Sequence, residues 1–119
     1  MLMLPPSVRI WVAAGATDLR RGFDGLDALV REVLGGDPMG GDLYVFRNRR
    51  GDKLKILFAS RQGLCLFAKR LERGVFHFPE DGKDPAMELD PAELAVLLEG
   101  LEFGKRRPAQ RRRPALALR

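Results

Sequence analysis

Three stretches of the chain have the apolar pattern of strands. Apolar residues recur at every second position near residues 8–13 and 53–59, which is typical of strands with one buried face, and residues 43–46 form a short apolar run. These patterns predict strands near residues 8–13, 43–47 and 53–59. The residues from Asn48 to Asp52, between the second and third stretches, are of turn-forming types. The second and third stretches are therefore expected to form a β-hairpin.

Three other stretches carry apolar residues at helical spacing, near residues 19–34, 63–73 and 91–102. Thr17 or Asp18 is expected to cap the first helix. Leu64, Phe67 and Leu71, at i, i+3 and i+7, form the apolar stripe of the second. The third helix has the clearest start, because Asp90, Pro91 and Glu93 supply an N-cap, a first-position proline and a capping-box acid.

These elements predict an α+β fold. We expect a small, mostly antiparallel sheet of about four strands, with about three helices packed on it. The fourth strand is predicted at residues 75–78, where aromatic and β-branched residues precede Pro79. Met87 and Leu89 offer one further short strand. Residues 1–103 are predicted to form a single domain, and residues 104–119 a disordered tail.

The distribution of charge divides the chain in the same way. The net charge is +5, but residues 104–119 contain seven basic residues and no acid, which leaves 14 basic and 16 acidic residues in positions 1–103. A basic arm of this kind attracts polyanions without sequence selectivity, or it simply solvates the chain. The single cysteine, the absence of a basic leader and the lack of a long apolar run predict a cytoplasmic protein without membrane contact.

Two groups of basic residues occur within the predicted domain. The first lies on the hairpin and the second on the predicted helix 63–73 and just before it. Together they are the candidate DNA-binding residues Arg47, Arg49, Arg50, Lys53, Lys55, Arg61, Lys69, Arg70 and Arg73. A ribbon with a charged tip is suited to the groove of a nucleic acid, although charged tips are also common on ordinary surfaces and edge strands.

The sequence offers little for catalysis. One cysteine and one histidine exclude zinc-finger spacing, and neither a phosphate-binding GxxxxGK[ST] loop nor a GxSxG elbow occurs. Cys65 and His77 are each flanked by apolar residues and are interpreted as packing residues. The acids Asp18, Asp24, Asp27 and Glu32 are interpreted as a helix cap and a solvated helix face rather than as a nuclease centre. No catalytic residue, metal site or cofactor is predicted.

Four motifs carry a resemblance to a known family. They are TDLRRGFDGLDALV (residues 17–30), LYVFRNRRGDKLKIL (43–57), QGLCLFAKRLERGVFHFP (62–79) and LDPAELAVLLEGLEF (89–103). In this order they resemble the TnpB accessory protein, the product of the second open reading frame of bacterial insertion sequences of the insertion sequence 66 group. The family often has an aromatic and an acid just ahead of the QGLCL run, where this chain has Phe58 to Arg61.

The resemblance implies a non-catalytic protein that is encoded beside a transposase and is needed for efficient movement of the element. With the basic groups, it leads to the hypothesis that the protein holds DNA phosphates and helps assemble the transposase on element ends. The alternative is a protein-binding adaptor whose apolar helix faces and Trp11 region dock the transposase or a second copy. The expected partners are therefore DNA and the transposase, with a homo-oligomer as a further option.

Overall fold

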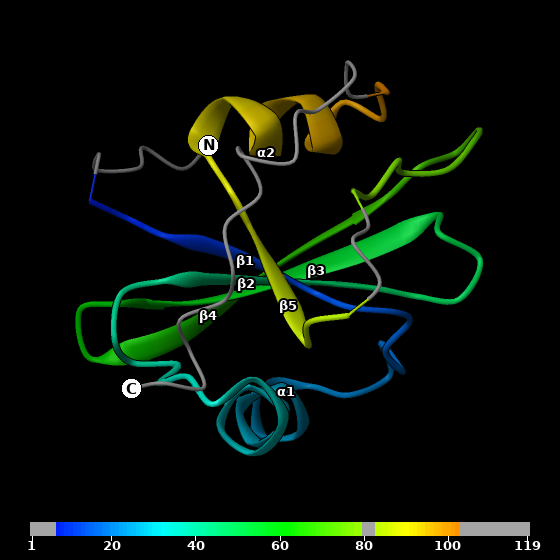
Figure 1. The fold of residues 1–119 in the computed structure, drawn as a ribbon. Helices are drawn as coiled ribbons and strands as arrows, with labels where there is room; N and C mark the ends of the chain where they lie inside the picture. The colour runs from blue at the N-terminus through cyan, green and yellow to red at the C-terminus, as the bar shows by residue number, and fades with distance from the viewer. Residues whose placement is uncertain (1–6, 80–82, 103–119) are drawn as a thin grey trace.

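The computed structural model describes residues 7–79 and 83–102 (Figure 1). It contains five strands and two helices. The strands are β1 (Ile10–Ala13), β2 (Leu43–Arg47), β3 (Lys53–Ser60), β4 (Gly63–Arg70) and β5 (Ala86–Leu89). The helices are α1 (Phe23–Leu29), which continues as the π-helical turn η1 (Val30–Leu34), and α2 (Pro91–Leu98). The predicted tail at residues 104–119 lies outside the described residues.

The five strands form one mixed sheet in the order β4-β3-β2-β1-β5. Strands β1 and β2 are parallel, with Trp11 opposite Tyr44, because the chain crosses between them through α1. The other neighbours are antiparallel, and β2, β3 and β4 follow one another through short turns. The chain therefore uses its middle third to build one half of the sheet by local pairing.

The helices cover opposite faces of the sheet (Figure 1), which gives three layers. On one face, Leu26, Val30 and Leu34 of α1 and η1 pack against a fully buried Trp11. On the other face, Leu94, Leu97 and Leu98 of α2 pack against a second apolar cluster that includes Val45 and Ile56. Burial of such side chains stabilises the fold by about 1.5–3 kcal/mol each, so both helices are held by their apolar stripes.

The prediction of a mostly antiparallel sheet of about four strands with about three helices is wrong. The largest error lies at residues 63–73, where the structure has strand β4 instead of a helix. Residues 63–70 pair in register with β3, from Ser60 opposite Gly63 to Lys53 opposite Arg70. The stripe of Leu64, Phe67 and Leu71 also fits a strand that is apolar on both faces, and the partner strand decided between the two.

The strand predicted at residues 75–78 is also absent from the described residues, and β5 completes the sheet in its place. Phe76 is buried beneath α2 and its N–H donates to the Gly51 carbonyl at 2.8 Å. This one bond is not continued into a ladder, so the segment crosses the end of the sheet as coil. The aromatic residues there serve packing: the ring centroids of Phe76 and Phe78 lie 6.2 Å apart, edge to face.

The two remaining helices start and stop closer to prediction. Helix α2 begins with the expected capping box, in which the Asp90 carboxylate accepts from the Glu93 N–H at 2.8 Å and the Glu93 carboxylate from the Asp90 N–H at 2.9 Å. Helix α1 begins at Phe23, later than expected, and its N-cap is Gly22 without a side-chain bond. Thr17 and Asp18 therefore do not cap this helix and belong to the loop before it.

Candidate nucleic-acid interface

The turn between β2 and β3 is shaped by one asparagine. The side-chain oxygen of Asn48 accepts from the N–H groups of Gly51 at 2.9 Å and Lys53 at 3.1 Å, and its amide donates to the Asp52 carboxylate at 2.7 Å. Gly51 occupies the left-handed region with φ +80°, which disfavours larger residues. This network turns the chain tightly and leaves Arg49 and Arg50 exposed at its tip. The hydrogen bond from Asn48 also lowers the pKa of Asp52, as do the nearby charges of Arg50 and Lys53.

Basic side chains continue from this turn along the hairpin. Lys53 of β3 lies directly opposite Arg70 of β4, and Lys55 lies opposite Ala68. Directly opposite residues of an antiparallel pair project from the same face, and strand alternation puts these with Leu57 on the α1 face. The Lys55 ammonium donates to the Arg21 carbonyl at 3.1 Å, which ties the hairpin to the loop before α1.

That loop forms the other wall of the site. The Thr17 N–H donates to the Arg47 carbonyl at 2.7 Å and anchors the loop at the end of β2. The Asp18 carboxylate accepts from the Arg20 side chain at 2.8 and 2.9 Å and from the Arg20 N–H at 3.0 Å. The side-chain hydrogen bonds lower the pKa of Asp18 to about 2, with a further contribution from the backbone N–H. Asp18 is therefore ionised at neutral pH and paired with Arg20.

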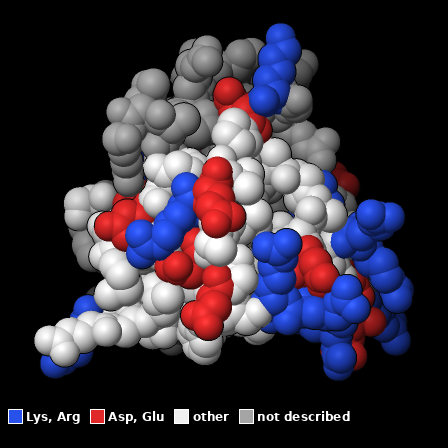
Figure 2. All heavy atoms as spheres, turned by 90° about the horizontal axis from the view of Figure 1, so that it is seen from below, with Lys and Arg blue, Asp and Glu red and all other residues white. Residues whose placement is uncertain are grey.

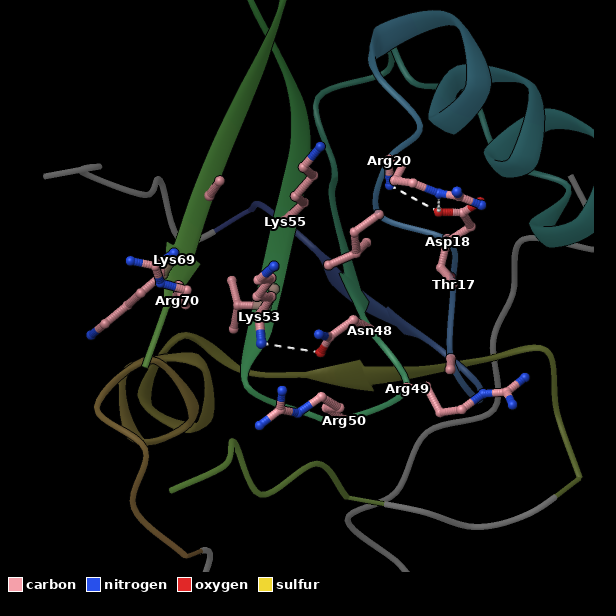
Figure 3. Close-up of a pocket in the computed structure, with 14 residues that line it drawn as sticks. Thr17, Asp18, Arg20, Asn48, Arg49, Arg50, Lys53, Lys55, Lys69 and Arg70 are labelled. Atoms are coloured by element: carbon pink, nitrogen blue, oxygen red, sulfur yellow. Dashed lines mark hydrogen bonds and ion pairs between the residues drawn. The ribbon is translucent and has the colours of Figure 1, made fainter. Parts of the chain in front are cut away.

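Loop, turn and hairpin enclose a cleft of about 820 Å³ (Figure 3). Its described lining includes seven basic residues and one acidic residue, Asp18. The basic residues are Arg20, Arg49, Arg50, Lys53, Lys55, Lys69 and Arg70. One of the seven, Lys69, has its ammonium bound on the α2 face of the sheet. Figure 2 shows lysine and arginine side chains gathered at one side of the face that carries α1, whereas acidic side chains gather nearer its middle. The cleft is thus cationic, although the domain as a whole is near neutral.

Six of the nine predicted DNA-binding residues line this cleft and three do not. The six are Arg49, Arg50, Lys53, Lys55, Lys69 and Arg70. Arg47 stacks over the Phe78 ring at 5.5 Å. Arg61 lies in the β3–β4 turn, at the other end of an eight-residue strand and so roughly 23 Å from Lys53 along β3. Arg73 is exposed beyond β4 and is not among the lining residues.

The lining cations differ in how they are paired. Arg20 is bound to Asp18, and Arg70 lies 3.0 Å from the Glu72 carboxylate. The Lys69 ammonium donates to the Leu98 carbonyl at 2.6 Å, at the end of α2 on the opposite face. Within residues 7–79 and 83–102, Arg49, Arg50 and Lys53 form no ion pair within 4.0 Å. These three are the cations most available to an anionic ligand.

Sequence reasoning missed the contribution of the loop at residues 16–20. Arg20 was not among the predicted site residues, and Thr17 and Asp18 were assigned to a helix cap. A signal was present, because the pair Arg20-Arg21 lies within the first of the four family motifs. It gave no indication of which face of the sheet the loop would join.

The described part of the chain offers neither a metal centre nor a membrane span. Residues 7–79 and 83–102 contain no group of three or more His, Cys, Asp or Glu side chains placed to hold a metal ion. No helix among the described residues is long and apolar enough to cross a bilayer.

The fold and the cleft define a class: a small three-layer domain with a mixed sheet and a cationic cleft at one end. The chain belongs to the IS66 Orf2-like family, because the family model described as "IS66 Orf2 like protein" matches residues 8–108. The predicted family resemblance is confirmed. It is an insertion-sequence accessory family, not a known catalytic one.

Two relatives come from Sinorhizobium fredii (strain NBRC 101917 / NGR234), and both are described as uncharacterised proteins. The chain is 45% identical to y4hO over 114 residues, which cover 94% of this chain and 96% of the relative. It is 42% identical to y4jC over 113 residues, covering 92% and 96%. No solved structure matches the chain.

Proposed function

We propose that this accessory protein holds the backbone phosphates of duplex DNA in its cationic cleft and so helps the transposase of the element assemble on element ends. The main observation behind this proposal is that basic residues from separate segments of the chain meet at one cleft. Basic residues from three separate segments, residues 20, 49–55 and 70, line one cleft with a single described carboxylate. Phosphate contacts by arginine and lysine release counterions and supply affinity without reading sequence.

The pairing of Lys53 with Arg70 supports an anionic ligand. Two cations directly opposite each other on one face of an antiparallel pair repel, and the solvent-exposed ion pair of Arg70 with Glu72 offsets only part of the cost to stability in the free protein. A phosphate between or beside them removes that cost. The pair is therefore better explained by a bound anion than by stability of the sheet.

The chemistry of the lining favours a duplex over a single strand. Proteins that bind single-stranded nucleic acid stack its bases on aromatic side chains. Of the described residues that line the cleft, none is aromatic. The backbone of a duplex presents phosphates without exposed base faces, which suits a cleft of guanidinium and ammonium groups.

The test compares two triple variants of equal charge. One replaces Arg49, Arg50 and Lys53 by alanine, and the control replaces Arg31, Arg61 and Arg73, which are also exposed but do not line the cleft. Binding to element-end duplexes is measured across a salt series. The cleft variant should weaken binding and reduce the slope of log K against log salt by about one per lost contact, roughly three in all. The control should keep most of the wild-type affinity and slope.

Two outcomes would contradict the proposal. One is no salt-sensitive binding by the wild-type protein, and the other is equal loss in both triple variants, which would indicate only a net-charge effect. Tighter binding to a single strand of the same sequence would contradict duplex DNA as the ligand, but the cleft would remain the proposed binding site.

The surfaces that the adaptor alternative assigned to partner binding, Trp11 and the apolar helix faces, are packed inside the fold. Trp11 is fully buried between the sheet and α1, and its indole N–H donates to the Asp42 carboxylate at 3.0 Å. The apolar stripe of α2 is likewise packed on the sheet. Co-purification with the transposase after nuclease treatment, with no DNA binding by the protein alone, would favour an adaptor that uses other surfaces.

A further inference from the structure

Strand β4 forms one edge of the sheet, and its outer main chain pairs with no other strand among the described residues (Figure 1). It has eight residues, whereas the opposite edge strand, β5, has four. An unpaired edge presents a row of N–H and C=O groups that another strand can extend. A long edge of this kind is a docking surface unless it is protected.

The usual protection is missing from most of β4. Proteins blunt exposed edges with charged residues, proline or bulges. Residues 63–68, GLCLFA, contain no charge and no proline, and their pairing with β3 runs without a bulge. Lys69 is charged, but its ammonium is held by the Leu98 carbonyl on the α2 face.

The side chains of β4 are apolar on both faces. Leu64 and Leu66 pack against the core on the α1 side of the sheet, and Phe67 packs against the core on the α2 side. Each of them, like Cys65, is only half-buried. The edge therefore leaves apolar surface uncovered above and below its free main chain.

We propose that a second copy of this chain covers this edge, by antiparallel pairing of β4 with β4 about a two-fold axis at Leu66. Directly opposite residues must project from the same face, so the two-fold axis must pass through a residue and not between two residues. With the axis at Leu66, the remaining pairs are Leu64 with Ala68, Cys65 with Phe67 and Gly63 with Lys69. Every central pair is apolar, and no two like charges face each other.

The two neighbouring registers place charged residues in less favourable pairs. Moving the axis to Cys65 places Arg61 opposite Lys69, two like charges. Moving it to Phe67 places Leu64 opposite Arg70 and Cys65 opposite Lys69, which sets a charge against an apolar residue in two pairs on each side. The charge pattern of the strand therefore selects Leu66 as the centre.

The arrangement has a geometric consequence for the cleft. A two-fold axis normal to the sheet keeps the α1 faces of both copies on the same side. The two Arg70 residues then lie eight residues apart along the strand direction, roughly 26 Å. Two cationic clefts would face the same way. The pairing itself does not depend on what the clefts bind.

A cysteine cross-link tests the register. Residues at the two-fold axis have Cα atoms about 4.5–5.5 Å apart, which is within disulfide range. The variant Leu66→Cys in a Cys65→Ser background should form a disulfide-linked dimer on mild oxidation. The wild-type protein is the matched control, because its two Cys65 residues would be offset by two positions and about 8 Å apart, beyond that range.

Mass measurement tests the dimer without any cysteine chemistry. The nuclease-treated full chain in high salt, free of DNA, should sediment at twice 13.3 kDa. Leu66→Lys should give a monomer, since two lysines would face each other at the axis, whereas Ala95→Lys on the exposed side of α2 should stay dimeric. A circular dichroism melt checks that the Leu66→Lys variant is folded.

Either of two results would overturn the inference: a monomeric wild-type chain at all concentrations tested, or a wild-type Cys65 cross-link that matches or exceeds that of the Leu66→Cys variant. Both measurements exclude DNA. A failure of the dimer therefore leaves the proposed DNA contact standing, and the reverse also holds.

Discussion

Asp18 shows how one residue organises one wall of the cleft. Its carboxylate holds the Arg20 guanidinium and the Arg20 N–H at once, although the pair is exposed to solvent. The carboxylate offsets one positive charge and also fixes where that charge lies. Asn48 acts in a similar way on the opposite wall by accepting two backbone N–H groups of the turn.

The pKa of Asp18 gives a prediction at this scale. Arg20→Gln should raise the pKa of Asp18 from about 2 toward its ordinary value near 3.9, because the side-chain hydrogen bond from Arg20 is the main cause of the shift. The measurement is an NMR titration of the Asp18 carboxyl carbon. Arg31→Gln, which removes a guanidinium bound to Asp27, should leave the Asp18 midpoint unchanged.

The sign of the pH effect follows from the direction of this shift. A carboxylate with a lowered pKa in the folded state stabilises the fold above its unfolded pKa, and that contribution is lost as pH falls from about 4 to about 2. Above pH 5 the contribution of the Asp18–Arg20 pair to stability should not change with pH. An unchanged Asp18 midpoint in Arg20→Gln would show that another group sets its pKa.

At the scale of elements, β4 shows where period alone is ambiguous. Its apolar residues fit a helical stripe and a two-sided strand equally well, and the basic residues fit a helix face. The tight turn before it decides the matter. Arg61 adopts φ +56°, which allows a two-residue turn that brings Gly63 opposite Ser60. Pairing with β3 then satisfies the backbone of one side of the strand.

The contact between η1 and β2 gives a prediction at the element scale. A Cβ at Gly36, just after η1, would lie 2.5 Å from the Oη of Tyr44, which is fully buried. Gly36→Ala should therefore lower the free energy of unfolding by about 1–3 kcal/mol through overpacking. The measurement is urea unfolding followed by circular dichroism.

Gly63→Ala is the matched control for this measurement. A Cβ at Gly63 would have only the Ser60 carbonyl at 4.0 Å, and its backbone is not left-handed. Its stability should stay the same or rise by about 0.4–1 kcal/mol, since alanine restricts the unfolded chain. A similar loss in both variants would point to backbone conformation instead of the Tyr44 contact.

At the scale of the whole molecule, the sheet sorts basic residues by face. Lys53 and Arg70 lie on the α1 side, whereas neighbouring Lys69 points to the α2 side and binds the last turn of α2. Residues 69 and 70 are adjacent in the chain and similar in charge. Their functions are expected to differ because strand alternation separates them.

This separation gives a paired prediction. Lys69→Gln should lower the free energy of unfolding by about 1 kcal/mol through the lost bond to the Leu98 carbonyl, and change DNA affinity little. Lys53→Gln should weaken DNA binding in low salt, and it should leave stability unchanged or slightly higher because it removes the repulsion between Lys53 and Arg70. Thermal melts and a filter-binding assay on both variants check the pattern. The reverse pattern would place the ligand on the α2 face.

The sequence by itself determined the elements whose signals are local. The hairpin of β2 and β3, the first strand and the capped start of α2 follow from alternation, turn residues and a capping box within a few positions. The four motifs were also sufficient for the family. Each of these signals is carried by neighbours in the chain.

Only the tertiary structure decided what depends on partners outside each segment. It made residues 63–70 a strand because the turn at Arg61 brings them beside β3, and it placed β1 parallel to β2 because α1 crosses between them. It brought Arg20 to the cleft and left Arg47, Arg61 and Arg73 out. The physical reason is that strand pairing and the face of a side chain are set by contacts with other segments of the chain, which the pattern within one segment does not record.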